Sequence, residues 1–338
     1  MKTVDLSNKR VIISRTDSIG DVMLTLPLCA WIKAKFPSAT LIFLGKGYTR
    51  AVVEAYELVD QFEDWADYAD LSKPVQLDWM SSLNADVIVH VFPNKELASL
   101  CKKTKISVRV GTSHRSYHLL TCTHRPNFTR KRSELHEAQL NHELLRPFGL
   151  TIIPSLEEII ASTTSFVASE TELPAQIEKA IINGSKCIVL HPKSQGSAKE
   201  WPMEKYLELT EELLAKGHTV FYTGTESEGA QFRERLPTHE RLMDTTGKLT
   251  LLELIYFISR VDYLLACSTG PLHIAGYLGV NTLGFYAPKR PIHPGRWKAL
   301  GPNVTILVND AACEKCAKKG ECDCIQQISV ATVLNEIA

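Results

Sequence analysis

The chain has 338 residues, of which 44% are hydrophobic, and it carries 38 basic and 38 acidic side chains. This length predicts two domains, each with enough apolar residues for its own core. A zero net charge lacks the basic excess of nucleic-acid-binding proteins, so we expect no nucleic-acid partner.

The longest apolar stretch, 261–287, is interrupted by Asp262 and Pro271, which favours buried elements over a membrane span. Charged residues near the N-terminus interrupt any signal peptide, and the odd count of nine cysteines fits a reducing compartment, so we predict a cytoplasmic protein.

Strand and helix patterns alternate through the first half of the chain. Short β-branched and apolar runs predict buried strands at 11–14, 39–45, 85–93 and 105–111. Apolar residues at helical spacing predict helices over 22–34 and around 49–56. This alternation is typical of a parallel sheet that helices cover on both faces. The pattern stops over 112–140, which is rich in Arg, Lys and His; it predicts either a solvated surface loop or a cationic rim for an anionic partner.

A stretch of Ser, Thr and Glu without apolar period, 161–175, is the predicted linker between the domains. After it, four strands are predicted at the runs 187–192, 218–224, 261–267 and 280–288. Helices are predicted at 176–182, 201–217, 251–260 and 271–279, and the third, apolar nearly all round, should be buried. The fold prediction is therefore α/β, with two Rossmann-like βαβ domains, 1–165 and 176–338, facing across a cleft.

Asp21 stands between a predicted strand and a predicted helix, in the sequence SIGD. A carboxylate in the first turn of a helix is favoured by the helix dipole, which would make Asp21 a plain surface charge. The alternative is a catalytic or ligand-binding carboxylate, because open α/β sheets place ligands at the carboxyl ends of their strands. Gly20 is expected to let the backbone turn tightly before it.

Two segments of the second half have the composition of anion-binding loops. HPKSQGSAKEWP (191–202) and CSTGPLHIAG (267–276) each leave a strand through Ser and Gly residues and enter a helix. Backbone N–H groups and a helix N-terminus attract phosphate oxygens, and Lys199 adds a charge. His273 is either a ligand contact or a buried structural histidine. Neither segment is a G-x-G-x-x-G or P-loop pattern, which disfavours dinucleotide enzymes and P-loop NTPases.

The combination of SIGDVMLTLP, HPKSQGSAKEWP, YTGTESE and STGPLHIAGYLG, in this order, resembles the ADP-heptose:lipopolysaccharide heptosyltransferases of glycosyltransferase family 9. The resemblance implies a GT-B fold, with donor binding mainly in the second domain. It also implies an inverting transfer from a nucleotide sugar, without a cofactor or a required metal. Residue by residue, it makes Asp21 the general base and places Lys199 at the donor phosphates.

The other donor-site candidates implied by the resemblance lie in the second domain: Ser194, Glu228, Ser268, Thr269, Gly270, Pro271 and His273. Of these, Glu228 lies near the acidic position that holds the ribose. Ser268 departs from the family pattern, where many relatives carry an aspartate, so the donor sugar stays open; a serine there can still cap the helix. Arg50, Arg115 and Arg130 are the acceptor-binding candidates, and the basic segment around Arg115 suits an acidic or phosphorylated acceptor.

The predicted function is transfer of a heptose from ADP-heptose to an inner-core acceptor of lipopolysaccharide at the inner membrane surface. A peripheral position on the cytoplasmic face of that membrane is compatible with this. The alternatives are another nucleotide sugar in surface-glycan synthesis, or a nucleotide-sugar epimerase or hydrolase of GT-B fold. Fold alone does not decide among these functions. The presence of Asp21 at the expected place argues against a binding module without catalysis.

Four cysteines lie within CEKCAKKGECDC (313–324). They are Cys313, Cys316, Cys322 and Cys324. C-x-x-C is one half of the usual zinc pattern, but C-x₅-C-x-C is not a usual second half. A short Lys-rich loop of this kind could equally hold a disulfide or free thiols. We rank a structural role first, a metal site second and redox catalysis last.

Overall fold

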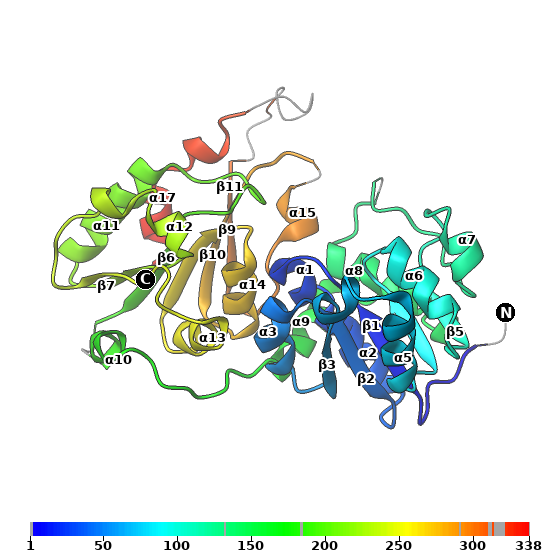
Figure 1. Ribbon diagram of the computed structural model, residues 1–338. Helices are drawn as coiled ribbons and strands as arrows, with labels where there is room; N and C mark the ends of the chain where they lie inside the picture. The colour runs from blue at the N-terminus through cyan, green and yellow to red at the C-terminus, as the bar shows by residue number, and fades with distance from the viewer. Residues whose placement is uncertain are drawn as a thin grey trace. The chain divides into compact units, whose positions relative to one another are not determined.

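The computed structural model describes residues 3–131, 133–182, 185–290, 292–309, 313 and 322–337. The chain divides into two compact units, Met1–Val167 and Ala168–Ala338. Each unit is an α/β layer structure around a parallel sheet, which confirms the predicted fold class (Figure 1). No helix in the described part of the chain combines the length and the hydrophobicity that a bilayer crossing requires.

The first unit contains a five-stranded parallel sheet in the order β3-β2-β1-β4-β5. Its strands are β1 (Arg10–Ser14), β2 (Thr40–Gly45), β3 (Gln61–Asp64), β4 (Val87–His90) and β5 (Val108–Val110). Its α-helices are α1 (Ile19–Met23), α2 (Leu26–Lys35), α3 (Arg50–Glu54), α4 (Ala66–Ala69), α5 (Lys73–Ser82), α6 (Lys95–Lys102), α7 (His118–Thr121), α8 (Glu137–His142) and α9 (Leu156–Ala161). Short 3₁₀ helices are η1 (Gly47–Thr49), η2 (Glu143–Phe148) and η3 (Ser162–Ser165).

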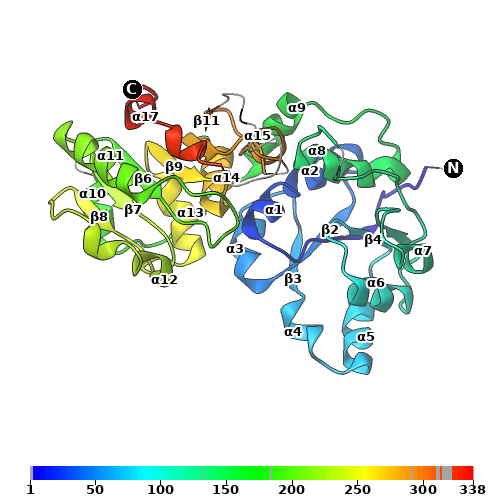
Figure 2. The ribbon, with the colours of Figure 1, turned by 90° about the horizontal axis from the view of Figure 1, so that it is seen from above.

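The core of this unit follows the alternation of the strands. Ile12 and Ile88 point to one face, where they pack with Trp79 of α5 and Leu97 of α6. Because successive strand residues point to opposite faces, the buried Val11 points to the other face. Figure 2 shows α2 and α8 on the side of the sheet opposite to α5 and α6. The loops that follow the strands leave the sheet at its carboxyl edge, which is where open α/β sheets bind their ligands.

The second unit contains a six-stranded parallel sheet in the order β11-β10-β9-β6-β7-β8. Its strands are β6 (Cys187–His191), β7 (Thr219–Tyr222), β8 (Leu242–Asp244), β9 (Tyr263–Cys267), β10 (Asn281–Tyr286) and β11 (Val304–Val308). Its helices are α10 (Ala175–Ile182), α11 (Met203–Ala215), α12 (Glu226–Gly229), η4 (Arg233–Arg235), α13 (Leu251–Ser259), α14 (Gly270–Tyr277), α15 (Pro294–Trp297), η5 (Ile325–Gln327) and α17 (Val330–Asn335).

Helices cover both faces of the second sheet (Figures 1 and 2). Leu209 of α11 and Val333 of α17 pack on one face, in a single buried cluster with Leu190 and Leu265 of the strands. On the other face Phe221 of β7 packs against Phe257 of α13, with 5.1 Å between the ring centroids. A parallel sheet covered in this way explains why its strands read as continuous apolar runs.

Three expectations about local structure were wrong. The helix predicted over 22–34 is two helices, α1 and α2, because Pro27 lies in the first turn of α2 and lacks the N–H that a continuous helix needs. Gly20 lies inside α1 with no left-handed backbone, so no tight turn precedes Asp21. The helix 251–260 is not buried all round, since Leu252 is 40% exposed.

The segment 112–140 is not a plain solvated loop. Its residues Thr112, His118 and Phe128 are buried, and it includes α7 and the start of α8. The predicted linker, 161–175, is likewise partly folded into the first unit. Phe166 is buried and forms an isolated bridge with Tyr56, so the division between the units falls after Val167. Irregular composition is a poor guide here because a few long-range contacts are enough to order a segment.

Candidate active site

The predicted donor residues of the second unit gather at one edge of its sheet. The order of the strands reverses between β9 and β6, whose registers pair His191 with Ala266. Ligands of open α/β sheets bind at such a switch point, outside the carboxyl ends of the strands. The loop 192–202 follows β6, and the turn into α14 follows β9. Both predicted anion-binding segments therefore leave neighbouring strands at the same edge.

Glu200 organises the loop that follows β6. Its carboxylate accepts hydrogen bonds from the Ser194 N–H (2.9 Å) and the Ser194 hydroxyl (3.0 Å), and it pairs with Lys193 at 2.7 Å. Burial raises the pKa of Glu200, but the bonds from Lys193 and Ser194 outweigh that effect and the pKa is lowered overall. Glu200 thus stays ionised and holds the loop closed on itself. Ser194 is buried, and its polar groups are used inside the loop rather than directed to a ligand.

The tip of this loop turns through two residues with left-handed backbone, Gln195 (φ 49°) and Gly196 (φ 80°). The Ser197 N–H closes the turn on the Ser194 carbonyl at 3.0 Å. Lys199 lies on the far side of the turn and is half-buried. Lys193 is neutralised by Glu200, whereas Lys199 makes no ion pair with any of the residues that the structure describes. Lys199 is therefore the loop lysine whose charge remains available to an anion.

No side chain among the described residues caps the N-terminus of α14. Thr269 is the N-cap, and its hydroxyl donates to the Cys267 carbonyl at 3.1 Å. The first N–H groups of a helix without a cap attract anions. Gly270 and Pro271 form the first turn. The expectation that Ser268 caps this helix was wrong, because Ser268 precedes the N-cap and its hydroxyl donates to the Trp297 carbonyl at 3.3 Å.

His273 and Glu228 are both buried near this edge. His273 is 2% exposed in the first half of α14. Glu228 is 4% exposed; its carboxylate accepts from the N–H of Thr225 at 2.7 Å, which closes a capping box at the start of α12. Sequence reasoning missed His191, the buried residue that ends β6. Burial lowers the pKa of His191, and the Glu228 carboxylate partly offsets this.

In the first unit, Asp21 belongs to a buried charge cluster around Arg15. Arg15 directly follows β1 and is 4% exposed. Its guanidinium binds Asp17 at 2.7 Å and Asp21, and the Ser18 hydroxyl donates to the other Asp21 oxygen at 2.5 Å. Burial opposes the charge of Arg15, but the carboxylates around it raise its pKa overall. Asp21 is therefore held in one orientation by two donors, which a plain surface charge would not require.

Asp17 is a second carboxylate at this site that sequence reasoning did not single out. Burial raises the pKa of Asp17 to about 6, and the nearby Asp21 adds to the rise while Arg15 opposes it. The Tyr48 hydroxyl donates to the Asp17 carbonyl at 2.6 Å and joins the loop after β2 to this cluster. The only sequence signal for Asp17 was its position after the strand, four residues before Asp21.

The cluster extends to one of the three predicted acceptor residues. Glu137, 1% exposed at the start of α8, lies 3.9 Å from Arg15 and 2.7 Å from Arg130. Arg130 is thus linked to Asp21 through Glu137 and Arg15. Arg50 instead pairs with Glu54 at 3.4 Å and lies over the Phe62 ring. The third candidate, Arg115, is exposed in the loop before α7.

Two Rossmann-like units, each built on a parallel sheet, are typical of the GT-B fold, the architecture of many nucleotide-sugar-dependent transferases. Residues 84–324 match the model of the family described as Glycosyltransferase family 9 (heptosyltransferase). The chain belongs to this family and is a glycosyltransferase.

Individual relatives agree with this assignment. A Haemophilus influenzae protein named "Putative glycosyltransferase" is 26% identical over 340 residues, covering 98% of this chain and 96% of the relative. The crystal structure of a glycosyl transferase family 9 protein from Veillonella parvula has a TM-score of 0.80 at 19% identity, covering 99% and 98% of the two chains. Escherichia coli ADP-heptose lipopolysaccharide heptosyltransferase II has a TM-score of 0.74 at 15% identity, covering 97% of each chain.

Proposed function

We propose that this glycosyltransferase transfers a heptose from ADP-heptose to an inner-core sugar of lipopolysaccharide, with inversion at the anomeric carbon. The family is described as heptosyltransferases, and a neighbouring structure is named for ADP-heptose and lipopolysaccharide. The proposal that the second unit binds the nucleotide-sugar donor rests on the carboxyl edge of its sheet. There an uncapped helix N-terminus and the available charge of Lys199 follow neighbouring strands, which suits a pyrophosphate.

The proposed mechanism divides the chemistry between the units. Asp21 takes the proton of the acceptor hydroxyl as that oxygen attacks the anomeric carbon, and the bond to ADP breaks. The N-terminus of α14 and Lys199 stabilise the charge that develops on the leaving diphosphate. Arg15 and Ser18 orient the Asp21 carboxylate. Arg130, bound to the same cluster through Glu137, is the acceptor contact that this arrangement favours over Arg50.

The base assignment is tested by Asp21→Asn, with Asp67→Asn as its matched control. Asp67 is also an aspartate in the first turn of a short helix, but it is exposed and lies outside the cluster. We expect Asp21→Asn to lower kcat about 10²–10⁴-fold with nearly unchanged donor affinity, and Asp67→Asn to leave kcat unchanged. Equal, small effects of both changes would show that Asp21 is only a charge favoured by the helix dipole.

Donor and acceptor are tested together by mass spectrometry. The purified protein is incubated with ADP-heptose and other nucleotide sugars, each with and without truncated core lipopolysaccharides. A product heavier by one heptose, whose new linkage NMR shows to be inverted at the anomeric carbon, supports the proposal. Transfer of another sugar would assign a different surface glycan, and the serine at position 268 makes that comparison necessary. Consumption of the donor without an acceptor would identify a hydrolase or an epimerase.

We propose further that the protein works at the cytoplasmic face of the inner membrane, where α7 attaches it to the surface. Leu119 and Leu120 are 61% and 74% exposed, and the exposed Arg115 precedes them. Exposed apolar side chains beside basic ones suit an anionic lipid surface. The double change of Leu119 and Leu120 to Ser should reduce flotation with anionic vesicles, whereas Ile152→Ser, at an 81% exposed site, should not. Equal flotation of both variants would refute this attachment.

A further inference from the structure

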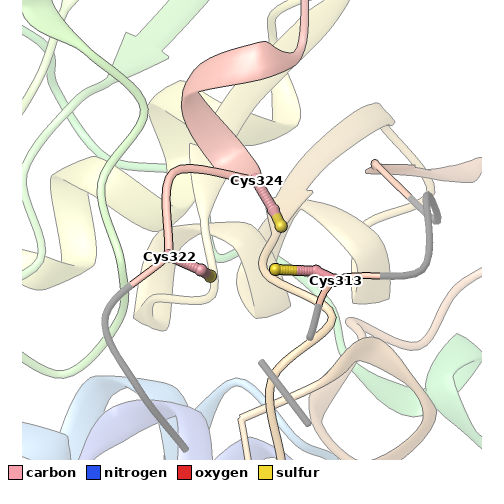
Figure 3. Close-up of side chains that lie close together, drawn as sticks. All are labelled: Cys313, Cys322 and Cys324. Carbon is pink, nitrogen blue, oxygen red and sulfur yellow. The ribbon is translucent and has the colours of Figure 1, made fainter. Parts of the chain in front are cut away.

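Three cysteines near the end of the second unit converge on one point (Figure 3). The sulfur atoms of Cys313, Cys322 and Cys324 all lie within 4.8 Å of one another. Cys322 and Cys324 are 6% and 4% exposed, and Cys313 is half-buried. Cys316, the other cysteine of this segment, lies outside the described residues, and we assign it no role.

The surroundings of the three sulfur atoms distinguish them from ordinary core cysteines. A buried cysteine usually packs as a small apolar residue among aliphatic side chains. These three form a cluster of their own, in which the described members are all cysteines, apart from the main core of the unit. Among the described members of this cluster three sulfur atoms gather without an aliphatic side chain, which apolar packing alone does not explain.

The geometry points to a bound metal ion, and we infer that Cys313, Cys322 and Cys324 hold one divalent zinc or iron ion as thiolates. Sulfur ligands of a tetrahedral zinc lie about 3.8 Å apart, given Zn–S bonds of about 2.3 Å, which is within the 4.8 Å limit observed. A disulfide would join only two of the three sulfur atoms, whereas a metal ion uses them all. Thiolates are soft ligands that favour zinc and iron over magnesium and calcium.

The position of the cluster assigns the ion a structural role. Cys313 comes five residues after β11, and Cys324 is the N-cap of η5. Just beyond η5, the Ile328 carbonyl accepts from the Trp201 indole at 3.0 Å and from Lys205 at 2.7 Å, and Ile325 and Ile328 belong to the main core. An ion bound by the three thiolates would therefore join the segment after β11 to the segment around η5, which is packed against the core. The inference is independent of the proposed donor, acceptor and base.

Metal content tests this inference on the full-length protein, purified without a metal-affinity step. We expect elemental analysis to find about one equivalent of zinc or iron per chain, and its identity to decide between the two ions. Cys313→Ser and Cys322→Ser should each lower this content at least tenfold. Cys122→Ala, at a buried cysteine of the first unit, is the control and should retain the metal.

Cobalt substitution is a second test, which uses the wild-type protein and does not depend on the folding of the serine variants. Wild-type protein stripped by a chelator under reducing conditions and reloaded with Co²⁺ should show the sulfur-to-metal charge transfer and the intense visible bands of a tetrahedral thiolate site. The inference is overturned if the wild-type protein carries no metal and gives no such spectrum. It is also overturned if mass spectrometry finds a disulfide among these cysteines, or if both serine variants keep the metal.

Discussion

His90 should make the stability of the first unit depend on pH. It ends β4 beside Ser14 of β1, at the switch point of the first sheet, and it is 1% exposed. Neither ring nitrogen has a hydrogen-bond partner among the described residues, and the ring stacks on His118 at 5.9 Å. Burial lowers the pKa of His90 from 6.5 to about 3 in the folded protein. The folded state therefore keeps His90 neutral where the unfolded chain binds a proton.

The size of the effect follows from these two pKa values. The unfolded state binds more protons below about pH 6.5, so stability is complete above that pH and falls as the pH is lowered towards 3. At pH 5 the loss attributable to His90 is about 2 kcal/mol, and at pH 8 it is close to zero. His90→Leu removes the proton-binding group but keeps an apolar side chain. Between pH 8 and pH 5 this variant should lose about 2 kcal/mol less stability than the wild type.

The assay must report on the first unit alone, because two-domain proteins need not unfold in one step. Urea unfolding read by pulsed hydrogen exchange and mass spectrometry at the β4 peptide meets this requirement. The exposed His114 provides the control variant, His114→Leu, which should lose as much stability as the wild type. If His90→Leu and wild type lose the same free energy over this pH range, His90 is not buried as a neutral ring and the reasoning is refuted.

Three further outcomes are expected in the second unit. Lys199→Ala should raise the Kd for the nucleotide sugar about 10- to 100-fold in calorimetry, through loss of a charged contact, while the exposed Lys216→Ala should leave it unchanged. Glu200→Ala should raise the same Kd about 10-fold, because the Ser194 N–H loses its acceptor and the loop loses its order. The Kd of Glu200→Gln should stay near that of the wild type, and equal Kd values for the two variants would argue against this role of Glu200. Replacing Cys313, Cys322 and Cys324 together by serine removes the proposed metal site, which at about 3 kcal/mol should lower the melting temperature by about 6–12 °C. Turnover at low temperature should change little, and the reverse pattern would point to a catalytic site.

Local patterns were enough to predict the architecture and to single out the two loop segments that we propose to bind the donor. The buried strands of both sheets are β-branched apolar runs, and the helix at Gly270 starts where glycine and proline follow a strand. These signals lie within a few residues of each other, so no long-range contact is needed to interpret them. Asp21 was also recognisable, because its place after β1 depends only on the strand and helix beside it.

The contacts of the candidate site residues, in contrast, depend on residues that are distant in the sequence or carry no local signal. Arg15 meets Glu137 across more than a hundred residues, and only the folded unit shows that Asp21 shares one cation with Asp17. Periodicity gives no information on such pairing, since it records which face a residue occupies and not what lies opposite. The same holds for the three cysteines: their spacing left a metal site, a disulfide and free thiols open, and only the fold shows that their sulfur atoms lie within 4.8 Å of one another.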